Sequence, residues 1–141
     1  MSDLTETIFI MLDDNVDEIF LTRRIVRRCG FVNRFISEQN PEDLISTMDG
    51  LVTLGTSKDS FLILLDINMP RIDGFEVLKT IRDHPIYKNI PVFMLSASED
   101  QEDIKKSDNL GSNGYIVKPF SDTQFFNALK NIPQIKQKLL Q

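Results

Sequence analysis

Short apolar segments alternate with amphipathic segments along the whole chain, and this alternation constrains the fold more than any other feature. Five segments are rich in Ile, Val, Phe and Leu, a length and composition typical of strands buried on both faces. They are residues 8–12, 31–36, 61–65, 91–95 and 115–117. Because helix-like segments separate these strands, the strands need crossover connections. The sequence therefore predicts an α/β fold, a doubly wound (βα)5 protein with a five-stranded parallel sheet and helices on both faces.

Capping residues mark the expected starts of three helices. Asn40 is followed by proline and two acids, a combination that favours the first turn of a helix. Ser98 with Gln101, and Ser121 with Gln124, have the spacing of a capping box. These signals place helices after the second, fourth and fifth predicted strands.

Composition limits the number of domains and the classes of partner. A chain of 141 residues that is 41% hydrophobic suits one domain, so we expect a single domain over residues 1–141 with no output domain. The net charge of −5 argues against nonspecific nucleic acid binding, which needs a basic face. The sequence has no secretory signal, no apolar run long enough for a membrane helix and a single cysteine. These features favour a cytoplasmic protein with no membrane partner.

Polar side chains stand at the carboxyl ends of four of the five predicted strands. Asp13 and Asp14 follow the first strand, Asp66 the third, Ser96 the fourth and Lys118 the fifth. In an open parallel sheet these ends meet at one edge, and ligands bind there. The sequence therefore predicts a single site that all of these side chains share.

The residue types at this edge indicate phosphoryl chemistry. Three carboxylates close together repel one another, and a divalent cation removes that problem. Oxygen ligands suit Mg²⁺, which takes one or two protein carboxylates together with water and phosphate oxygens. A carboxylate beside a metal ion and Lys118 can attack phosphorus to form an acyl phosphate, and Ser96 can donate to a phosphoryl oxygen. We predict reversible phosphorylation of Asp66, assisted by Mg²⁺.

Taken together, the motifs resemble the receiver domain of two-component response regulators, in particular the chemotaxis-regulator type. The matching phrases are the acidic pair near the N-terminus, LLDINMPRIDG, LSAS and YIVKPF. The likeness covers roughly residues 7–132 and implies the flavodoxin-like receiver fold. The phrase DEIFLTRRIVRR also resembles stand-alone receivers that serve phytochrome-type kinases. Some of those form dimers, which leaves a homodimer open.

The resemblance implies roles for the residues around the acceptor. Asp66 resembles the phosphoacceptor, and Asp13 and Asp14 resemble the acidic pair that organises the metal ion. Asn68 lies where the family uses a backbone carbonyl as a metal ligand. Asn68 and Ser98 occupy the two positions that tune the lifetime of the phosphoryl group. Because serine reaches less far than a carboxylate or amide, we hypothesise a modest rate of self-dephosphorylation.

The resemblance also implies a switch at the fourth and fifth strands. Ser96 resembles the switch hydroxyl, and Lys118 resembles the lysine that is invariant in the family. The bond between Lys118 and Pro119 is cis in the family. Tyr115 lies where the family places an aromatic residue that turns inward on activation, although plain core packing explains this tyrosine equally well.

The first helix carries a predicted partner surface. Ile19 and Phe20 point in different directions from Leu21 around the helix, so they cannot both be buried with it. In the family this helix docks a sensor histidine kinase or a histidine phosphotransfer protein. We hypothesise that Ile19 and Phe20 make an apolar partner contact with a rim of arginines that includes Arg23. The residues assigned to the stripe that faces the sheet are Leu21, Ile25 and Cys29.

Output is expected through contact with a downstream protein target, without direct nucleic acid binding. The expected surface comprises the fourth helix, the fifth strand and the fifth helix, because Ser96 and Tyr115 connect it to the phosphoryl site. This expectation follows from the resemblance and from the absence of any segment of the sequence that resembles an attached output domain.

Three other classes of protein fit the sequence less well. A haloacid dehalogenase-type enzyme also forms an aspartyl phosphate, but it needs a second aspartate at the position of Asn68. A nucleotide-binding module needs a G-x-x-x-x-G-K-[ST] motif, which this sequence lacks. An inactive scaffold would lack some of the site residues, and all are present. Taken singly, Asp13 and Asp14 are also suited to cap a helix, and Ser96 to bond the backbone.

Overall fold

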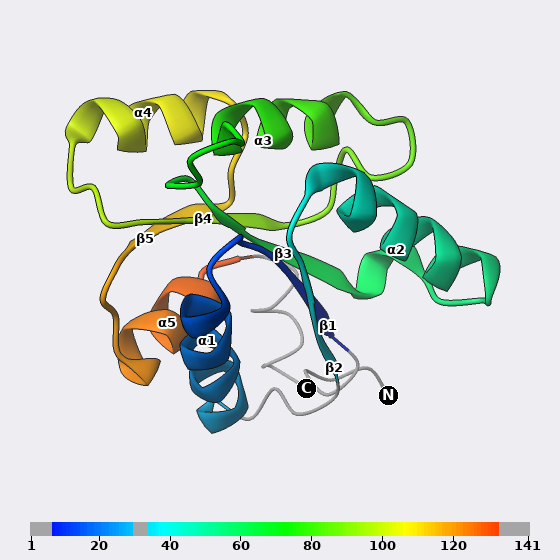
Figure 1. Ribbon diagram of the computed structural model, residues 1–141, viewed down its shortest axis with the longest axis horizontal. Coiled ribbons are helices and arrows are strands. Elements are labelled where there is room, and N and C mark those ends of the chain that lie inside the picture. The colour runs from blue at the N-terminus through cyan, green and yellow to red at the C-terminus, as the bar shows by residue number, and fades with distance from the viewer. Residues whose placement is uncertain (1–6, 30–33, 133–141) are drawn as a thin grey trace.

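The computed structural model describes residues 7–29 and 34–132. Strands and helices alternate along the chain, as Figure 1 shows. The strands are β1 (Ile8–Leu12), β2 (Arg34–Glu38), β3 (Phe61–Asp66), β4 (Val92–Ser96) and β5 (Gly114–Val117). The helices are α1 (Val16–Arg28), α2 (Pro41–Thr53), the short 3-10 helix η2 (Lys58–Ser60), α3 (Gly74–Asp83), α4 (Gln101–Asn109) and α5 (Asp122–Leu129). The first part of the predicted second strand lies outside the described residues.

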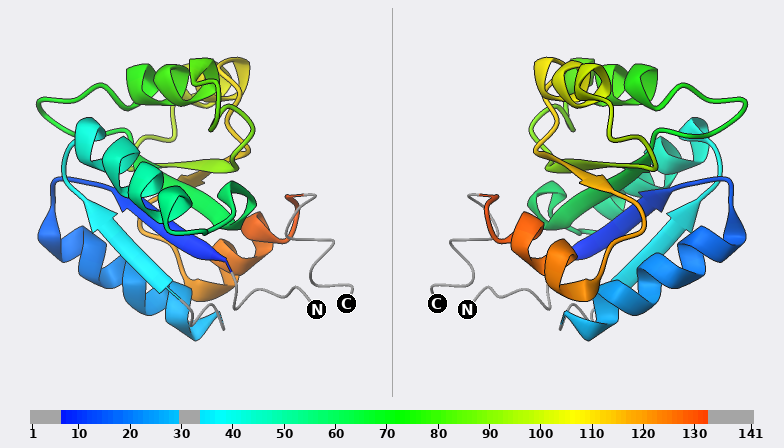
Figure 2. Two further views of the ribbon diagram at one scale, coloured as in Figure 1. Left: turned by 90° about the vertical axis from the view of Figure 1, so that its right-hand side faces the viewer. Right: turned by 90° about the vertical axis from the view of Figure 1, so that its left-hand side faces the viewer.

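The five strands form one parallel sheet in the order β2-β1-β3-β4-β5, which confirms the predicted doubly wound (βα)5 fold. Helices α1 and α5 cover one face, and α2, α3 and α4 cover the other (Figures 1 and 2). The chain leaves β1 toward β2 on one side and returns to β3 on the other. The order of strands therefore reverses between β1 and β3, where such sheets bind their ligands.

The core lies on both faces of the sheet. Every residue of β1, β3 and β4 is buried, as predicted for strands covered on two sides. Alternate residues serve opposite faces: Ile8 and Ile10 pack with α2 and α3, whereas Phe9 and Met11 pack with α1 and α5. Within the described parts of the chain, every helix is too short or too polar to cross a lipid bilayer.

Two of the three predicted helix starts are confirmed. Asn40 caps α2 with its side chain, and Ser121 forms a full capping box with Gln124 at the start of α5. The box predicted at Ser98 is wrong, because Asp100 caps α4 instead. The Ser98 hydroxyl accepts a hydrogen bond from the Asp100 N–H, so it shapes the turn just before the helix.

The predicted orientation of α1 is also wrong. Leu21 is 56% exposed and Phe20 is 58% exposed, whereas Ile19 is only 5% exposed and belongs to the core. Ile25 and Cys29 are half-buried at the edge of the packed face. Ile19 therefore cannot serve as a surface contact for a partner. The polar Thr22 lies in the middle of the stripe that is buried. The predicted stripe has no such polar residue and therefore appeared more apolar. The residues of the true stripe are Ile19, Thr22 and Val26.

Candidate functional site

Two aspartates lie side by side at the carboxyl edge of the sheet. Leu12 of β1 pairs with Leu65 of β3, so the residues that follow them, Asp13 and Asp66, are neighbours. Both are buried although aspartate is an ionisable residue: Asp13 is 0% exposed and Asp66 is 3% exposed. Buried carboxylates need a partner of opposite charge or a metal ion, so this pair marks the centre of the site.

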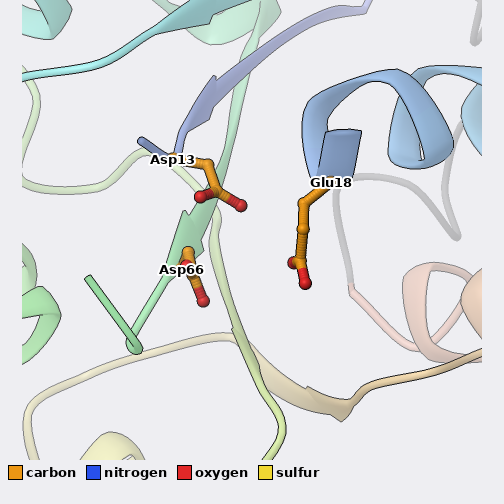
Figure 3. Close-up of side chains that lie close together, drawn as sticks. All are labelled: Asp13, Glu18 and Asp66. Atoms are coloured by element: carbon orange, nitrogen blue, oxygen red, sulfur yellow. The ribbon is translucent and has the colours of Figure 1, made fainter. Parts of the chain in front are cut away.

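Glu18, which the sequence reasoning missed, adds a third acid. Figure 3 shows the carboxylates of Asp13, Glu18 and Asp66 gathered between the ends of β1 and β3 and the start of α1. One ligand oxygen from each lies within 4.8 Å of the others. Glu18 occupies the first turn of α1, where its N–H donates to the capping Asn15 side chain. An acid at that position is usual at helix starts, so the local sequence pattern does not distinguish Glu18 from an ordinary helix-start residue.

Lys118 supplies the positive charge of the cluster. Its Nζ donates hydrogen bonds to Glu18 Oε2 and, at 3.0 Å, to Asp66 Oδ1, and it lies 3.8 Å from Asp13 Oδ2. Burial alone would lower the pKa of Lys118, but the hydrogen bond to Glu18 and the charges of Asp66 and Asp13 outweigh burial and raise it. Lys118 therefore stays protonated across the physiological range. The bond from Lys118 to Pro119 is cis, as the resemblance implied.

The ionised form of Asp13 is destabilised by its surroundings in the cluster. Its Oδ1 accepts a hydrogen bond from the Asn15 N–H at 3.0 Å, but its buried Oδ2 has no hydrogen-bond partner. Burial, together with the nearby charges of Asp66 and Glu18, raises the pKa of Asp13 to about 7. Lys118 is not enough to balance three acids. The unsatisfied oxygen and the all-oxygen ligand set fit a hard divalent cation such as Mg²⁺.

Ser96 and the following residue present hydrogen-bond donors beside Asp66. Ser96 is the last residue of β4 and is fully buried. Its hydroxyl donates to the side-chain Oδ1 of Asn68 at 2.9 Å, and the N–H of Ala97 donates to the same oxygen at 3.0 Å. The N–H of Asn68 in turn donates to Asp66 Oδ1 at 3.1 Å. The predicted switch serine therefore lies in the site, linked to Asp66 through Asn68.

A cavity of about 330 Å³ opens over this cluster. Its lining includes Asp66, Lys118, Asn68 and Asp14. Asp14 is exposed and stands outside the group of three close acids, so its direct contact with a metal ion stays a prediction. Ser98 is half-buried and lies outside this lining, with its hydroxyl committed to Asp100.

Tyr115 connects β5 to the segment that follows Ser96. Its side chain is half-buried against the core on the α2 and α3 face, and its hydroxyl donates to the Ser98 carbonyl at 2.9 Å. The tyrosine is thus bound at its polar end and packed at its apolar end. Core packing and a switch role both remain compatible with this position.

Gly74 lets the start of α3 approach the end of β3, where Asp66 lies. A Cβ at this first residue of α3 would lie 2.8 Å from the Asp66 carbonyl oxygen and 2.9 Å from the Ile67 Cα. Both neighbours are backbone atoms that cannot move aside cheaply. Close packing of α3 against the end of β3 therefore requires glycine at this position.

A second, more apolar cavity of about 320 Å³ lies beside the site, between α1 and the segment after β5. Leu21 and Ile25 line it from α1, Phe120 lines it from the other side, and Lys118 reaches it as well. Arg23 is half-buried, with its guanidinium 5.2 Å from the ring centre of Phe35, so it packs along the surface of the protein. The exposed apolar face of α1 therefore borders the cluster of Glu18 and Lys118 directly.

Replacing Glu18 with glutamine is expected to weaken Mg²⁺ binding by about tenfold, since it removes one of three charges within 4.8 Å. Titration with Mg²⁺ followed by NMR or calorimetry measures the change. Asp17→Asn is the matched control, because Asp17 is exposed in the same turn of α1 and lies outside the acid group. Equal losses in both variants would show that Glu18 acts only through the net charge of the helix.

The fold and this site define a class of protein: a doubly wound α/β domain with a buried aspartate, further acids, a lysine and a hydroxyl at the switch point of its sheet. The sequence profile of the response regulator receiver domain family matches residues 9–130, and the chain belongs to this family. The family and fold predictions are therefore confirmed. The chain is a receiver domain of two-component signalling.

Known relatives agree with this assignment. The chain is 36% identical over 119 residues to chemotaxis protein CheY-3 of Vibrio cholerae, covering 83% of this chain and 87% of that protein. A response regulator receiver domain from Rhodospirillum rubrum is similar in structure, with a TM-score of 0.72, 27% identity and 96% of each chain covered. The bacteriophytochrome response regulator AtBRR gives a TM-score of 0.72 at 26% identity, covering 89% of this chain and 91% of its own.

Proposed function

We propose that Asp66 accepts a phosphoryl group from the phosphohistidine of a sensor kinase or histidine phosphotransfer protein. The observation that carries this proposal is the position of Asp66: it is 3% exposed, lies 3.0 Å from the Lys118 ammonium, and borders a cavity of about 330 Å³. In the reaction, an Asp66 carboxylate oxygen forms a bond to phosphorus. The bond from phosphorus to the imidazole nitrogen breaks, and the nitrogen keeps the electron pair.

The residues around Asp66 have separate tasks in this proposal. Lys118 balances charge on the phosphoryl oxygens, and Ser96 donates its hydroxyl to one of them. Asp13, Glu18 and Asp66 supply side-chain oxygens for Mg²⁺, with Asp14 nearby and the Asn68 backbone carbonyl as a further ligand. Mg²⁺, when bound, offsets negative charge on the transferring group. The protein is then a phosphoacceptor switch that assists its own phosphorylation and dephosphorylation.

Incubation with acetyl phosphate and Mg²⁺ tests the proposal. Mass spectrometry is expected to show a gain of one phosphoryl group in the natural sequence and none in Asp66→Asn. Asp59→Asn is the control, because Asp59 is an exposed acid far from the site in the fold and is expected to keep the gain. Phosphorylation that persists in Asp66→Asn would assign the acceptor to another residue.

The phosphoryl donor is proposed to dock over α1 and the neighbouring apolar cavity. Phe20 and Leu21 are exposed apolar side chains on α1, and the cavity that Leu21 lines reaches Lys118. A helix laid in this place would bring its histidine to the open side of the site. Arg23 borders the surface but is already packed on Phe35, so its contribution is expected to be smaller.

Phe20→Ala is expected to slow phosphotransfer from the cognate donor by about tenfold, because exposed aromatic side chains often dominate interfaces. Since Phe20 is 58% exposed, the free energy of unfolding is expected to change by less than about 0.5 kcal/mol. Phosphotransfer kinetics and urea denaturation measure the two effects. Leu54→Ala is the matched control, because Leu54 is 85% exposed at the end of α2. Equal rates in the two variants would remove Phe20 from the docking surface.

The output surface is proposed to comprise α4, β5 and α5. The hydrogen bond from Tyr115 to the Ser98 carbonyl supports this, because it ties β5 to the segment between Ser96 and α4. A movement of Ser96 on phosphorylation would therefore alter the hydrogen bond of Tyr115. Binding to a downstream protein target through this surface remains a proposal, as do homodimer formation and the tuning of phosphoryl lifetime by Ser98 and Asn68.

A further inference from the structure

The two donors best placed to hold a phosphoryl oxygen are already engaged by a side chain of the protein. The Ser96 hydroxyl and the Ala97 N–H both point at the side-chain oxygen of Asn68, at 2.9 and 3.0 Å. A backbone N–H can only donate, so the atom that faces Ala97 must be the amide oxygen and not the amide nitrogen. Asn68 therefore presents an oxygen where the reaction would bring one.

The neighbouring contacts hold the Ser96 hydroxyl in place but leave the Asn68 side chain free to rotate. Ser96 is fully buried, and its oxygen also accepts a hydrogen bond from the Ser98 N–H at 3.0 Å. The Ser96 hydroxyl hydrogen is thereby directed toward Asn68. The residue Asn68, by contrast, is exposed, so its side chain can rotate into water at little cost in packing. Its backbone stays in place, because the Asn68 N–H donates to Asp66 Oδ1 at 3.1 Å.

We propose that the Asn68 carboxamide is a built-in competitor of the phosphoryl group. In the unphosphorylated protein it fills the oxygen position between Ser96 and Ala97, and it must rotate away before a phosphoryl oxygen can accept both hydrogen bonds. This inference rests on the proposed function, since it assumes that Asp66 is the acceptor. Asn68 then sets how readily the site loads, through its side chain and independently of its backbone.

The expected size of the effect follows from the two hydrogen bonds. When a binding-competent state is only partly populated, the apparent affinity falls by that fraction. Two neutral hydrogen bonds of ordinary net strength favour the closed arrangement by about tenfold. Asn68→Ala removes the competing oxygen and leaves Ser96 and Ala97 free. It is expected to tighten the binding of beryllofluoride, a phosphoryl analogue, by about tenfold at saturating Mg²⁺.

The experiment separates this effect from a general disturbance of the site. Beryllofluoride and Mg²⁺ are titrated separately into the full chain, and binding is followed by NMR or calorimetry. The Mg²⁺ affinity of Asn68→Ala is expected to stay within about twofold of the natural sequence, because the backbone carbonyl is retained. Asn89→Ala is the matched control, since Asn89 is exposed in the loop between α3 and β4 and is expected to change neither affinity.

A second measurement needs no ligand. The Ala97 amide is expected to exchange its hydrogen faster in Asn68→Ala than in the natural sequence, because it loses its acceptor. The proposal is overturned if Asn68→Ala binds beryllofluoride no more tightly than the natural sequence, or if Ala97 exchange is unchanged. Failure of the proposed function looks different: the natural sequence itself would bind no beryllofluoride and gain no phosphoryl group from acetyl phosphate.

Discussion

Asp13→Asn is expected to stabilise the metal-free protein by about 2–4 kcal/mol at pH 8. Burial and the neighbouring acids raise the pKa of Asp13 from its ordinary 3.8 to about 7. At pH values between 3.8 and about 7, Asp13 is therefore protonated in the folded state but ionised in the unfolded chain. Stability must fall as the pH rises through this window, and above it the full cost of burying the charged form remains. The neutral amide escapes that cost.

Chemical denaturation between pH 4 and 8 without metal tests this expectation, with the window set by the pKa values of 3.8 and about 7. The natural sequence is expected to lose stability across the range, whereas Asp13→Asn lacks this contribution. Mg²⁺ reverses the order, because it stabilises the natural sequence and binds about a hundredfold less tightly to Asp13→Asn. Asp108→Asn serves as control, since Asp108 is exposed on α4. A natural protein whose metal-free stability did not fall with pH would contradict the assigned burial of Asp13.

Gly74→Ala is expected to destabilise the protein by about 1–3 kcal/mol and to slow phosphorylation of Asp66. The added methyl group would lie 2.8 Å from the Asp66 carbonyl oxygen, so either α3 or the end of β3 must move. Because the acceptor carboxylate belongs to the same residue as that carbonyl, the movement also displaces the reacting group. Urea denaturation and the rate of phosphorylation by acetyl phosphate measure the two consequences.

The control for this substitution has the opposite expected sign. Gly50 lies inside α2, and a Cβ there would meet nothing within 4 Å. Gly50→Ala should therefore raise the free energy of unfolding by about 0.5–1 kcal/mol, through helix propensity and a less flexible unfolded chain. Two glycine-to-alanine changes in one protein then separate steric exclusion from backbone entropy. Similar effects of the two substitutions would show that close packing at Gly74 is relaxed in solution.

The role of Glu18 and the buried face of α1 could not be predicted from local sequence patterns. The position of Glu18 in the first turn of a helix is explained by the helix dipole, and only its distance to Asp13 and Asp66 reveals a second role. Similarly, two faces of α1 carry apolar residues at helical spacing, and the polar Thr22 made the buried face look less apolar than the other. The side of a helix that packs depends on the partner surface as well as on the pattern of the helix itself.

The alternation of strands and helices, the parallel sheet and the meeting of Asp13, Asp66, Ser96 and Lys118 at one edge followed from the sequence alone. These features depend on periodicity and chain connectivity, which are local properties that a parallel sheet converts into a fixed geometry. Tertiary structure alone decided the orientation of α1, the entry of Glu18 into the acid group and the engagement of Ser96 by Asn68. Each of these depends on distances between side chains from different elements, and such distances are set only when the elements pack together.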